Sequence, residues 1–163
     1  MRIDPIDSRG ILATAAFLML ALFIQPSQAQ THKDEHPGGT AHRLELDHGK
    51  KWATDEPLRK GMGEIRNLIA ASEPGFRKGK LAQEDYAALG TKIEEQVAYI
   101  VANCKLEPRA DENLHVVLAG IISGADAMQG KDRKVTAAAG ARKVIAGLNS
   151  YGRYFDHPGW KRL

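Results

Sequence analysis

Four separate stretches of this sequence carry apolar residues at helical spacing, and that pattern constrains the fold more than any other feature. In each stretch the apolar positions recur every three or four residues, which places them on one side of an α-helix. Residues that break helices, such as Pro74, Pro108 and Gly130, separate the stretches. No stretch alternates apolar and polar residues as a half-buried strand does. The sequence therefore predicts an all-α protein.

Capping residues set the expected ends of these helices. Thr54 is the expected N-cap of the first helix, Asp111 caps the third, and Gly130 ends it. The expected helices span about 55–72, 81–105, 112–129 and 132–153. Helices joined by short turns bury their apolar sides well as an antiparallel, up-down-up-down four-helix bundle. We expect this bundle over residues 52–155, followed by a C-terminal tail over residues 156–163.

The apolar sides of the expected helices supply the core. The positions expected there are Leu58, Met62, Ile65, Ile69, Tyr86, Leu89, Ile93, Val97, Ile100, Cys104, Leu114, Leu118, Ile121, Ala125, Met128, Ala137, Ala141, Val144, Leu148, Tyr151 and Phe155. Gly120, Gly124, Gly140 and Gly147 interrupt the third and fourth helices, and each costs about 1 kcal/mol relative to alanine. Either close packing of the two helices or space for a flat cofactor is expected to offset that cost.

Residues 1–29 have the organisation of a secretory signal peptide. Arg2 and Arg9 precede an apolar run over residues 11–24, and Ser27, Gln28 and Ala29 form a cleavage signal. The run is shorter than the roughly 20 residues that a helix needs to span a bilayer. The sequence therefore predicts an exported, periplasmic protein without a stable membrane anchor.

Residues 30–51 combine glycine, threonine and charged residues without an apolar side, which is typical of a flexible arm. The arm contains His32, His36, His42 and His48. Neutral imidazole is a common ligand for borderline metal ions, so these histidines are candidates for weak metal capture. The alternative interpretation is an unstructured polar leader with no ligand.

Composition and motifs exclude several classes of function. Acidic and basic residues alternate along the expected helices and the formal net charge is only +3, so no nucleic-acid surface is predicted. A single cysteine cannot form an internal disulfide. The sequence contains no phosphate-binding loop, nucleophile elbow or His-Glu-x-x-His zinc motif. We therefore expect a binding protein and not an enzyme.

One end of the predicted bundle collects metal-binding residue types. Alternating helix directions bring Met62, Cys104, His115 and His157 to the same end. Thiol, thioether and imidazole are the soft and borderline donors that suit Cu(I). These residues predict a copper-binding protein that buffers or handles the metal, with a periplasmic protein as candidate partner. The alternative is that Met62 and Cys104 fill the core while the histidines lie at the surface or in a turn.

Two segments resemble the soluble periplasmic b-type cytochromes. They are ENLHVVLAGIISGADAMQGK at residues 112–131 and LNSYGRYF at residues 148–155, within a similarity that covers residues 55–155. The resemblance implies a four-helix bundle that holds one haem between a Met of the first helix and a His of the last. Its axial Met falls on Met62 and its axial His on Gly152, and glycine cannot ligate iron. Haem binding or electron transfer is therefore an alternative function.

A third interpretation needs no cofactor. Trp52, Trp160 and the segment FDHPGWKRL at residues 155–163 place aromatic side chains near the ends of the expected bundle. Exposed aromatic residues are frequent anchors in protein interfaces. In this interpretation the bundle is an interaction or stress-related module, unless the aromatic side chains pack within the chain itself.

Overall fold

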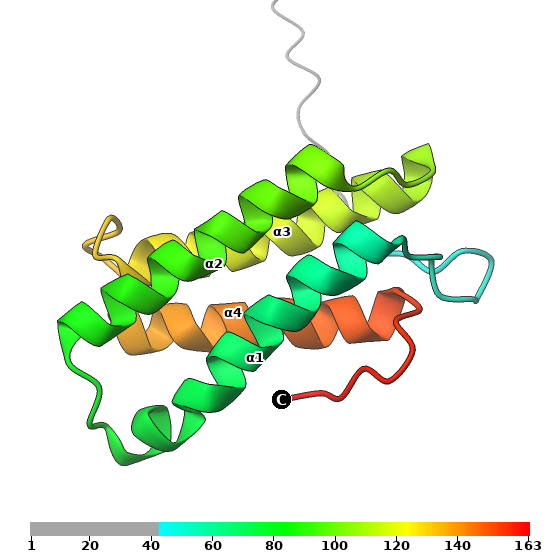
Figure 1. The fold of residues 1–163 in the computed structure, drawn as a ribbon. Helices are drawn as coiled ribbons and strands as arrows, with labels where there is room; N and C mark the ends of the chain where they lie inside the picture. Colours follow the sequence, from blue (N-terminus) through cyan, green and yellow to red (C-terminus); the bar gives the residue numbers. More distant parts are fainter. Residues whose placement is uncertain (1–42) are drawn as a thin grey trace, which may run out of the picture. The chain divides into compact units, whose positions relative to one another are not determined.

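The computed structural model describes residues 43–163, and these residues form a bundle of four helices (Figure 1). The helices are α1 (Glu56–Lys78), α2 (Gln83–Asn103), α3 (Pro108–Met128) and α4 (Ala137–Tyr154). Residues 43–163 contain isolated β-bridges but no strand, and successive helices run in opposite directions (Figure 1). The predicted all-α four-helix bundle is therefore confirmed. None of the helices described has an apolar stretch long enough to cross a membrane.

Helix α1 begins one residue later than predicted and ends later. Its N-cap is Asp55, whose Oδ1 accepts a hydrogen bond from the backbone N of Leu58 at 2.9 Å. The helix continues through Pro74, because a proline within a helix removes one hydrogen bond and tertiary packing can offset that loss. It ends at Gly79, which has the left-handed φ of 58° that a glycine C-cap favours.

The start of α3 also differs from the prediction. Pro108 was expected only to end the preceding helix, whereas it occupies the first turn of α3, where its missing N–H needs no partner. The cap is Glu107, which accepts from Ala110 N at 2.7 Å, and Asp111 lies in the first turn. Helix α4 begins later than expected, at Ala137, because Thr136 is the residue that caps it.

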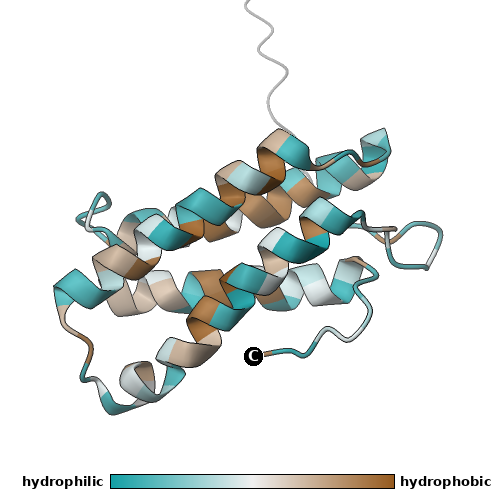
Figure 2. Cartoon of the chain, in the orientation of Figure 1, coloured by the Kyte–Doolittle hydropathy of each residue, from teal (hydrophilic) through white to brown (hydrophobic). Residues whose placement is uncertain are grey.

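The predicted core is largely confirmed. All of the core positions predicted from the sequence are buried except Cys104 and Ala137, which are partly buried and pack against the core. Each helix alternates between brown and teal along its length in Figure 2, as a helix with one apolar side does. The sequence pattern missed Trp52, Ala110, Val117 and Ala127. Ala110 and Ala127 are small and lie near the ends of α3, and Trp52 precedes α1, so apolar periodicity is a weak guide at these three positions.

Close packing of α3 against α4 accounts for three of the four glycines expected to interrupt these helices, Gly124, Gly140 and Gly147. These two helices share the most extensive contact of any pair. A Cβ atom added at Gly124 would lie 2.7 Å from the carbonyl O of Gly140, and one added at Gly140 would lie 2.5 Å from that of Gly124. A Cβ at Gly147 would lie 2.7 Å from Ile121 Cγ1, whereas one at Gly120 would meet no atom within 4 Å. Gly120 therefore has no packing explanation.

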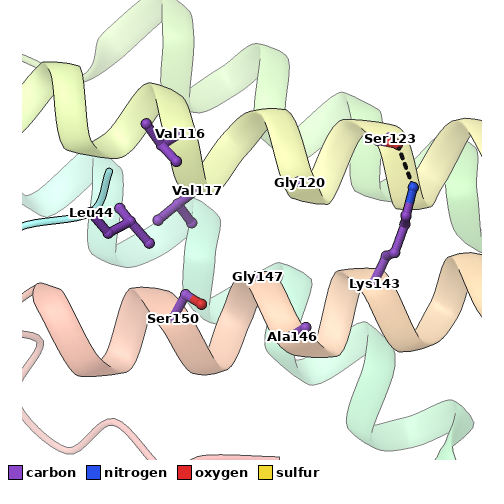
Figure 3. Close-up of a pocket in the computed structure, with 9 residues that line it drawn as sticks. All are labelled: Leu44, Val116, Val117, Gly120, Ser123, Lys143, Ala146, Gly147 and Ser150. Atoms are coloured by element: carbon purple, nitrogen blue, oxygen red, sulfur yellow. Dashed lines mark hydrogen bonds between the residues drawn. The ribbon is translucent and has the colours of Figure 1, made fainter. Parts of the chain in front are cut away.

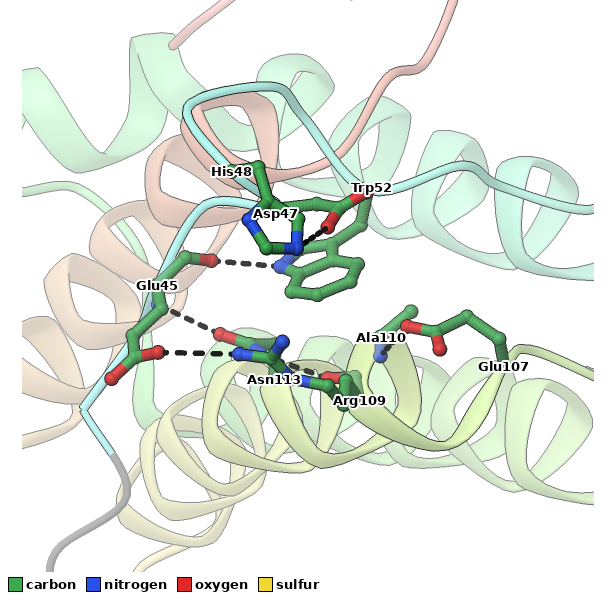
Figure 4. A network of polar contacts seen from close by, with 8 residues as sticks. All are labelled: Glu45, Asp47, His48, Trp52, Glu107, Arg109, Ala110 and Asn113. Carbon is green, nitrogen blue, oxygen red and sulfur yellow. Dashed lines mark hydrogen bonds and ion pairs between the residues drawn. The ribbon is translucent and has the colours of Figure 1, made fainter.

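The segment before α1 is fastened to the bundle by Trp52. Its side chain is 3% exposed, and its backbone N donates to Tyr154 O while its carbonyl accepts from Asp156 N, both at 2.8 Å. Its indole Nε1 donates to Glu45 O at 2.7 Å, and Glu45 N donates to Asn113 Oδ1 at 2.8 Å (Figure 4). Trp52 therefore serves as an intramolecular anchor that links the N-terminal segment to α3 and α4.

Matched alanine substitutions should separate the two kinds of glycine. Gly124→Ala is expected to lower the free energy of unfolding by about 1–3 kcal/mol, because the new methyl group overpacks a helix contact. Gly120→Ala is expected to raise it by about 0.4–1 kcal/mol, because the methyl group enters open space and the unfolded chain loses freedom. Urea unfolding of the two variants and the parent protein measures both. Equal destabilisation by the two would contradict this account of the packing.

Candidate functional site at one end of the bundle

The carboxylate of Asp55 lies where α1 begins and α2 ends. One oxygen caps α1, and the other accepts a hydrogen bond from the backbone N of Lys105 at 2.6 Å. The Cys104 thiol lies close enough to this carboxylate for Asp55 to raise the thiol pKa. A carboxylate that accepts from several donors is held in one orientation, so Asp55 fixes the end of α2 relative to the start of α1.

Cys104 is the C-cap of α2 and has extended backbone angles, although the apolar periodicity had assigned it to the last helical turn. It is half-buried and is the only cysteine of the chain. Burial, together with the charges of Asp55 and Asp111, raises the pKa of the Cys104 thiol to about 12. The thiol is therefore protonated at neutral pH and needs an added positive charge to ionise.

Cys104, Asp111 and His115 line the same pocket. Its volume is about 280 Å³, and its other lining residues are Ile100, Val101, Leu114 and Leu118. The imidazole of His115 is exposed, and its Nδ1 lies 2.9 Å from the carbonyl O of Asp111 and 3.4 Å from Asp111 Oδ2. Thiol, carboxylate and imidazole groups thus face one cavity between the end of α2 and the start of α3.

The other two predicted ligands of this end lie elsewhere. Met62 is fully buried in the core and does not line the pocket. His157 packs against Tyr151 and Trp160, with its Nδ1 3.0 Å from the Tyr151 hydroxyl. Burial and the charge of Arg59 lower the pKa of His157. His157 is therefore committed to an aromatic cluster of Tyr151, Phe155, His157 and Trp160, in which Phe155 stacks on Tyr151.

Gly152, the position that the cytochrome resemblance assigns to an axial ligand, lies beneath Trp160. A Cβ atom at Gly152 would collide with Nε1 and Cδ1 of the Trp160 indole. The indole Nε1 is buried and has no hydrogen-bond partner in the described part of the chain. The glycine therefore allows the C-terminal tail to fold back over α4. The Arg66 side chain donates a hydrogen bond to the backbone O of Lys161, and the Asn149 side chain donates to Leu163 O and accepts from Leu163 N.

Of the arm histidines, only His48 lies among the described residues; His32, His36 and His42 lie outside them. His48 is exposed in the turn that Asp47 and Lys50 close by two backbone hydrogen bonds of 2.8 Å. Its Nε2 lies 3.8 Å from Asp47 Oδ1 (Figure 4). His48 thus has one nearby carboxylate and is free to take an external ligand.

Sequence reasoning missed the two carboxylates that surround Cys104. Asp55 and Asp111 were assigned only to helix starts, since an acidic residue near a helix N-terminus normally needs no other explanation. Their approach to the thiol depends on how three helix ends meet. Within residues 43–163, no three His, Cys, Asp or Glu side chains come close enough together to ligate one ion as they stand.

Comparison with known proteins yields no relative. No protein-family model matches the sequence, and no curated protein or solved structure matches it significantly. The similarity to b-type cytochromes therefore stays an interpretation of short sequence segments. Function has to be inferred from the side chains of the chain itself.

Acid should destabilise the fold through His157. Its pKa in the folded protein lies below the ordinary value of 6.5, so the unfolded chain binds this proton more readily. The contribution of His157 to stability is therefore complete above pH 6.5 and is lost as the pH falls below that value. The melting temperature of His157→Gln, which cannot take up the proton, should change less between about pH 7.5 and 5.5. An identical pH dependence in both proteins would refute this role.

Gly152→Ala should displace the Trp160 indole. The added methyl group overlaps the indole, and relief of such overpacking typically costs about 1–3 kcal/mol of folding free energy. Trp160 emission should shift to longer wavelength as the indole gains solvent. Gly152→Ala introduced into the Trp160→Phe protein should lower the free energy of unfolding by less, as measured by urea unfolding. A cost as large in that background would show that the clash involves another group.

Proposed function

We propose that this chain is an exported copper-binding protein of four-helix-bundle fold, which holds Cu(I) between the Cys104 sulfur and the His115 imidazole. The observation that supports this is that a thiol, an imidazole and a carboxylate line one pocket. A soft thiolate and a borderline imidazole favour Cu(I) over Mg²⁺ or Ca²⁺, which prefer oxygen ligands. Copper buffering or handling is the function that follows.

The electrostatics of the pocket favour a cation. Asp55 and Asp111 are the charges that oppose ionisation of Cys104, because a thiolate beside two carboxylates is repelled. A bound Cu(I) ion reverses this balance, since its charge offsets the thiolate and is attracted by both carboxylates. The metal therefore takes the place of the thiol proton, and binding releases that proton to solvent.

The donor set suits an ion that accepts few ligands. Tetrahedral Zn²⁺ sites normally need four ligands, which the pocket does not offer. Cu(I) tolerates low coordination numbers, so Cys104 and His115 suffice, with Asp111 orienting the imidazole. Met62 lies in the core and is not required. The exposed position of His115 leaves one side of the ion open for exchange with a periplasmic partner.

Export and the histidine arm complete the proposal. The apolar run over residues 11–24 supports secretion to the periplasm, and His32, His36, His42 and His48 supply weaker, additional capture of metal. Haem binding gains no support, because the position expected to carry its axial histidine is Gly152, which packs under Trp160. No catalytic arrangement is proposed.

Competition for Cu(I) against a chelator tests the pocket. The protein is used with the four arm histidines replaced by asparagine, so that the pocket is measured separately. Cys104→Ser should weaken Cu(I) binding more than tenfold, equivalent to about 1.4 kcal/mol, because a hydroxyl is a hard and rarely ionised donor. His115→Gln should also weaken it, whereas Met62→Leu should leave it unchanged, because Met62 does not line the pocket.

A buried methionine supplies the control. Met128 is fully buried at the other end of α3, so Met128→Leu should leave Cu(I) affinity unchanged. Since the thiol pKa is about 12, affinity in the parent should rise about tenfold per pH unit around neutrality, as expected for release of one proton. Unchanged affinity in Cys104→Ser, or affinity independent of pH, would show that Cys104 is core filler and not a ligand.

A further inference from the structure

A second cavity lies between α3 and α4, on a different side of α3 from the Cys104 pocket. Its volume is about 290 Å³, at the lower end of the roughly 300–1,000 Å³ typical of small-molecule sites. Leu44, Val116 and Val117 form one end, and Lys143 and Ser123 the other (Figure 3). Gly120, Gly147 and Ala146 lie between these ends, so the middle of the groove is lined by backbone and by one methyl group.

The two glycines of this groove, Gly120 and Gly147, differ in whether helix packing requires them. Gly147 is required for packing, because a Cβ there would press on Ile121. Gly120 is not required, because a Cβ there meets nothing within 4 Å. A glycine in a helix interior is unfavourable relative to alanine, and this cost at Gly120 is not offset by any helix contact. What the missing side chain provides is open space in the groove.

The charged end of the groove has an unneutralised cation. Lys143 Nζ hydrogen-bonds to the neutral hydroxyl of Ser123 at 3.0 Å (Figure 3). Among residues 43–163, the ion pairs involve other side chains, and Lys143 takes part in none of them. Lys131, in the turn after α3, is in contrast paired with both Glu94 and Asp126. Lys143 is therefore available to an anion that enters the groove.

We propose that the groove between α3 and α4 binds a single-chain fatty acid, with its alkyl chain along Val116, Gly120 and Gly147 and its carboxylate on Lys143. The groove is open to solvent at Gly120 and Ala146, and its largely apolar lining with one cation at its end matches a molecule that has one apolar chain and one terminal negative charge. Ser123 is placed to donate its hydroxyl to the same carboxylate. This site is independent of copper binding at Cys104.

If residues 1–29 are removed, as the proposed export requires, the remaining chain supplies no apolar occupant of its own for this groove. Leu44 already closes the end near the start of α3. The thirteen residues from 30 to 42 contain one alanine and one proline but no valine, leucine, isoleucine, methionine, phenylalanine, tyrosine or tryptophan. Nothing in that composition can replace an alkyl chain in an apolar channel, so a separate ligand is the better match.

Titration with dodecanoate and dodecylamine below their micelle concentrations, and with dodecanol below its solubility limit, tests the site. Isothermal calorimetry of the whole protein should show saturable binding of dodecanoate, weaker binding of dodecanol and none of dodecylamine. Gly120→Leu and Ala146→Leu should each abolish binding, because their side chains occupy the channel. Lys143→Gln should weaken dodecanoate binding several-fold and leave dodecanol binding unchanged.

Two matched variants serve as controls. Gly63 of α1 also has no atom within 4 Å of an added Cβ and lies outside the groove, so Gly63→Leu should bind dodecanoate normally. Lys92 is an exposed lysine of α2, and Lys92→Gln should likewise have no effect. Absence of saturable dodecanoate binding would overturn the proposal. So would unchanged affinity in Gly120→Leu, or an equal loss of dodecanoate and dodecanol binding in Lys143→Gln.

Discussion

The close approach of α3 and α4 at Gly124 and Gly140 is the constraint on which the rest of the bundle depends. Because each glycine lies against the backbone of the other helix, no side chain separates the two helices at that level. The pair then offers a continuous surface to α1 and α2. Gly90 allows a similar close approach of α2 to α3, since a Cβ there would lie 2.8 Å from Ala125 O and hold the two helices apart. Towards Gly120 no such contact exists, and a groove opens.

At the end of the bundle where α1 begins, the carboxylate of Asp55 joins the start of α1 to the end of α2. Asp55 caps α1, accepts a hydrogen bond from the backbone N–H of Lys105 and raises the pKa of the Cys104 thiol. The same contacts that join two helix ends raise the pKa of the thiol. Structural and chemical roles are therefore coupled at this residue, since a cation that replaced the thiol proton would also relieve the repulsion that the fold imposes there.

Much of the fold follows from periodicity, whereas the composition of the site does not. Leu58, Ile93, Ile121 and Leu148 were predicted in the core from spacing alone and are fully buried. The predicted ligands were grouped by helix end, which is too coarse to say which side chains share a cavity. Cys104 and His115 do share one, while Met62 lies in the core and His157 faces Tyr151. Helix rotation and the path of the tail decide between these outcomes, and neither leaves a local pattern in the sequence.

The sequence by itself determined the helical class, the number of helices and most of the core, because apolar spacing and capping are local properties that each segment carries alone. Only the tertiary structure decided that Asp55 and Asp111 lie near Cys104, that Trp160 covers Gly152, and that Lys143 forms no ion pair within residues 43–163. Asp55 and Cys104 are distant in sequence, and the nearer residues in these contacts are separated by a helix end and a turn. Such contacts depend on how whole helices and chain ends meet, and the free energy that selects them is spread over the packed core.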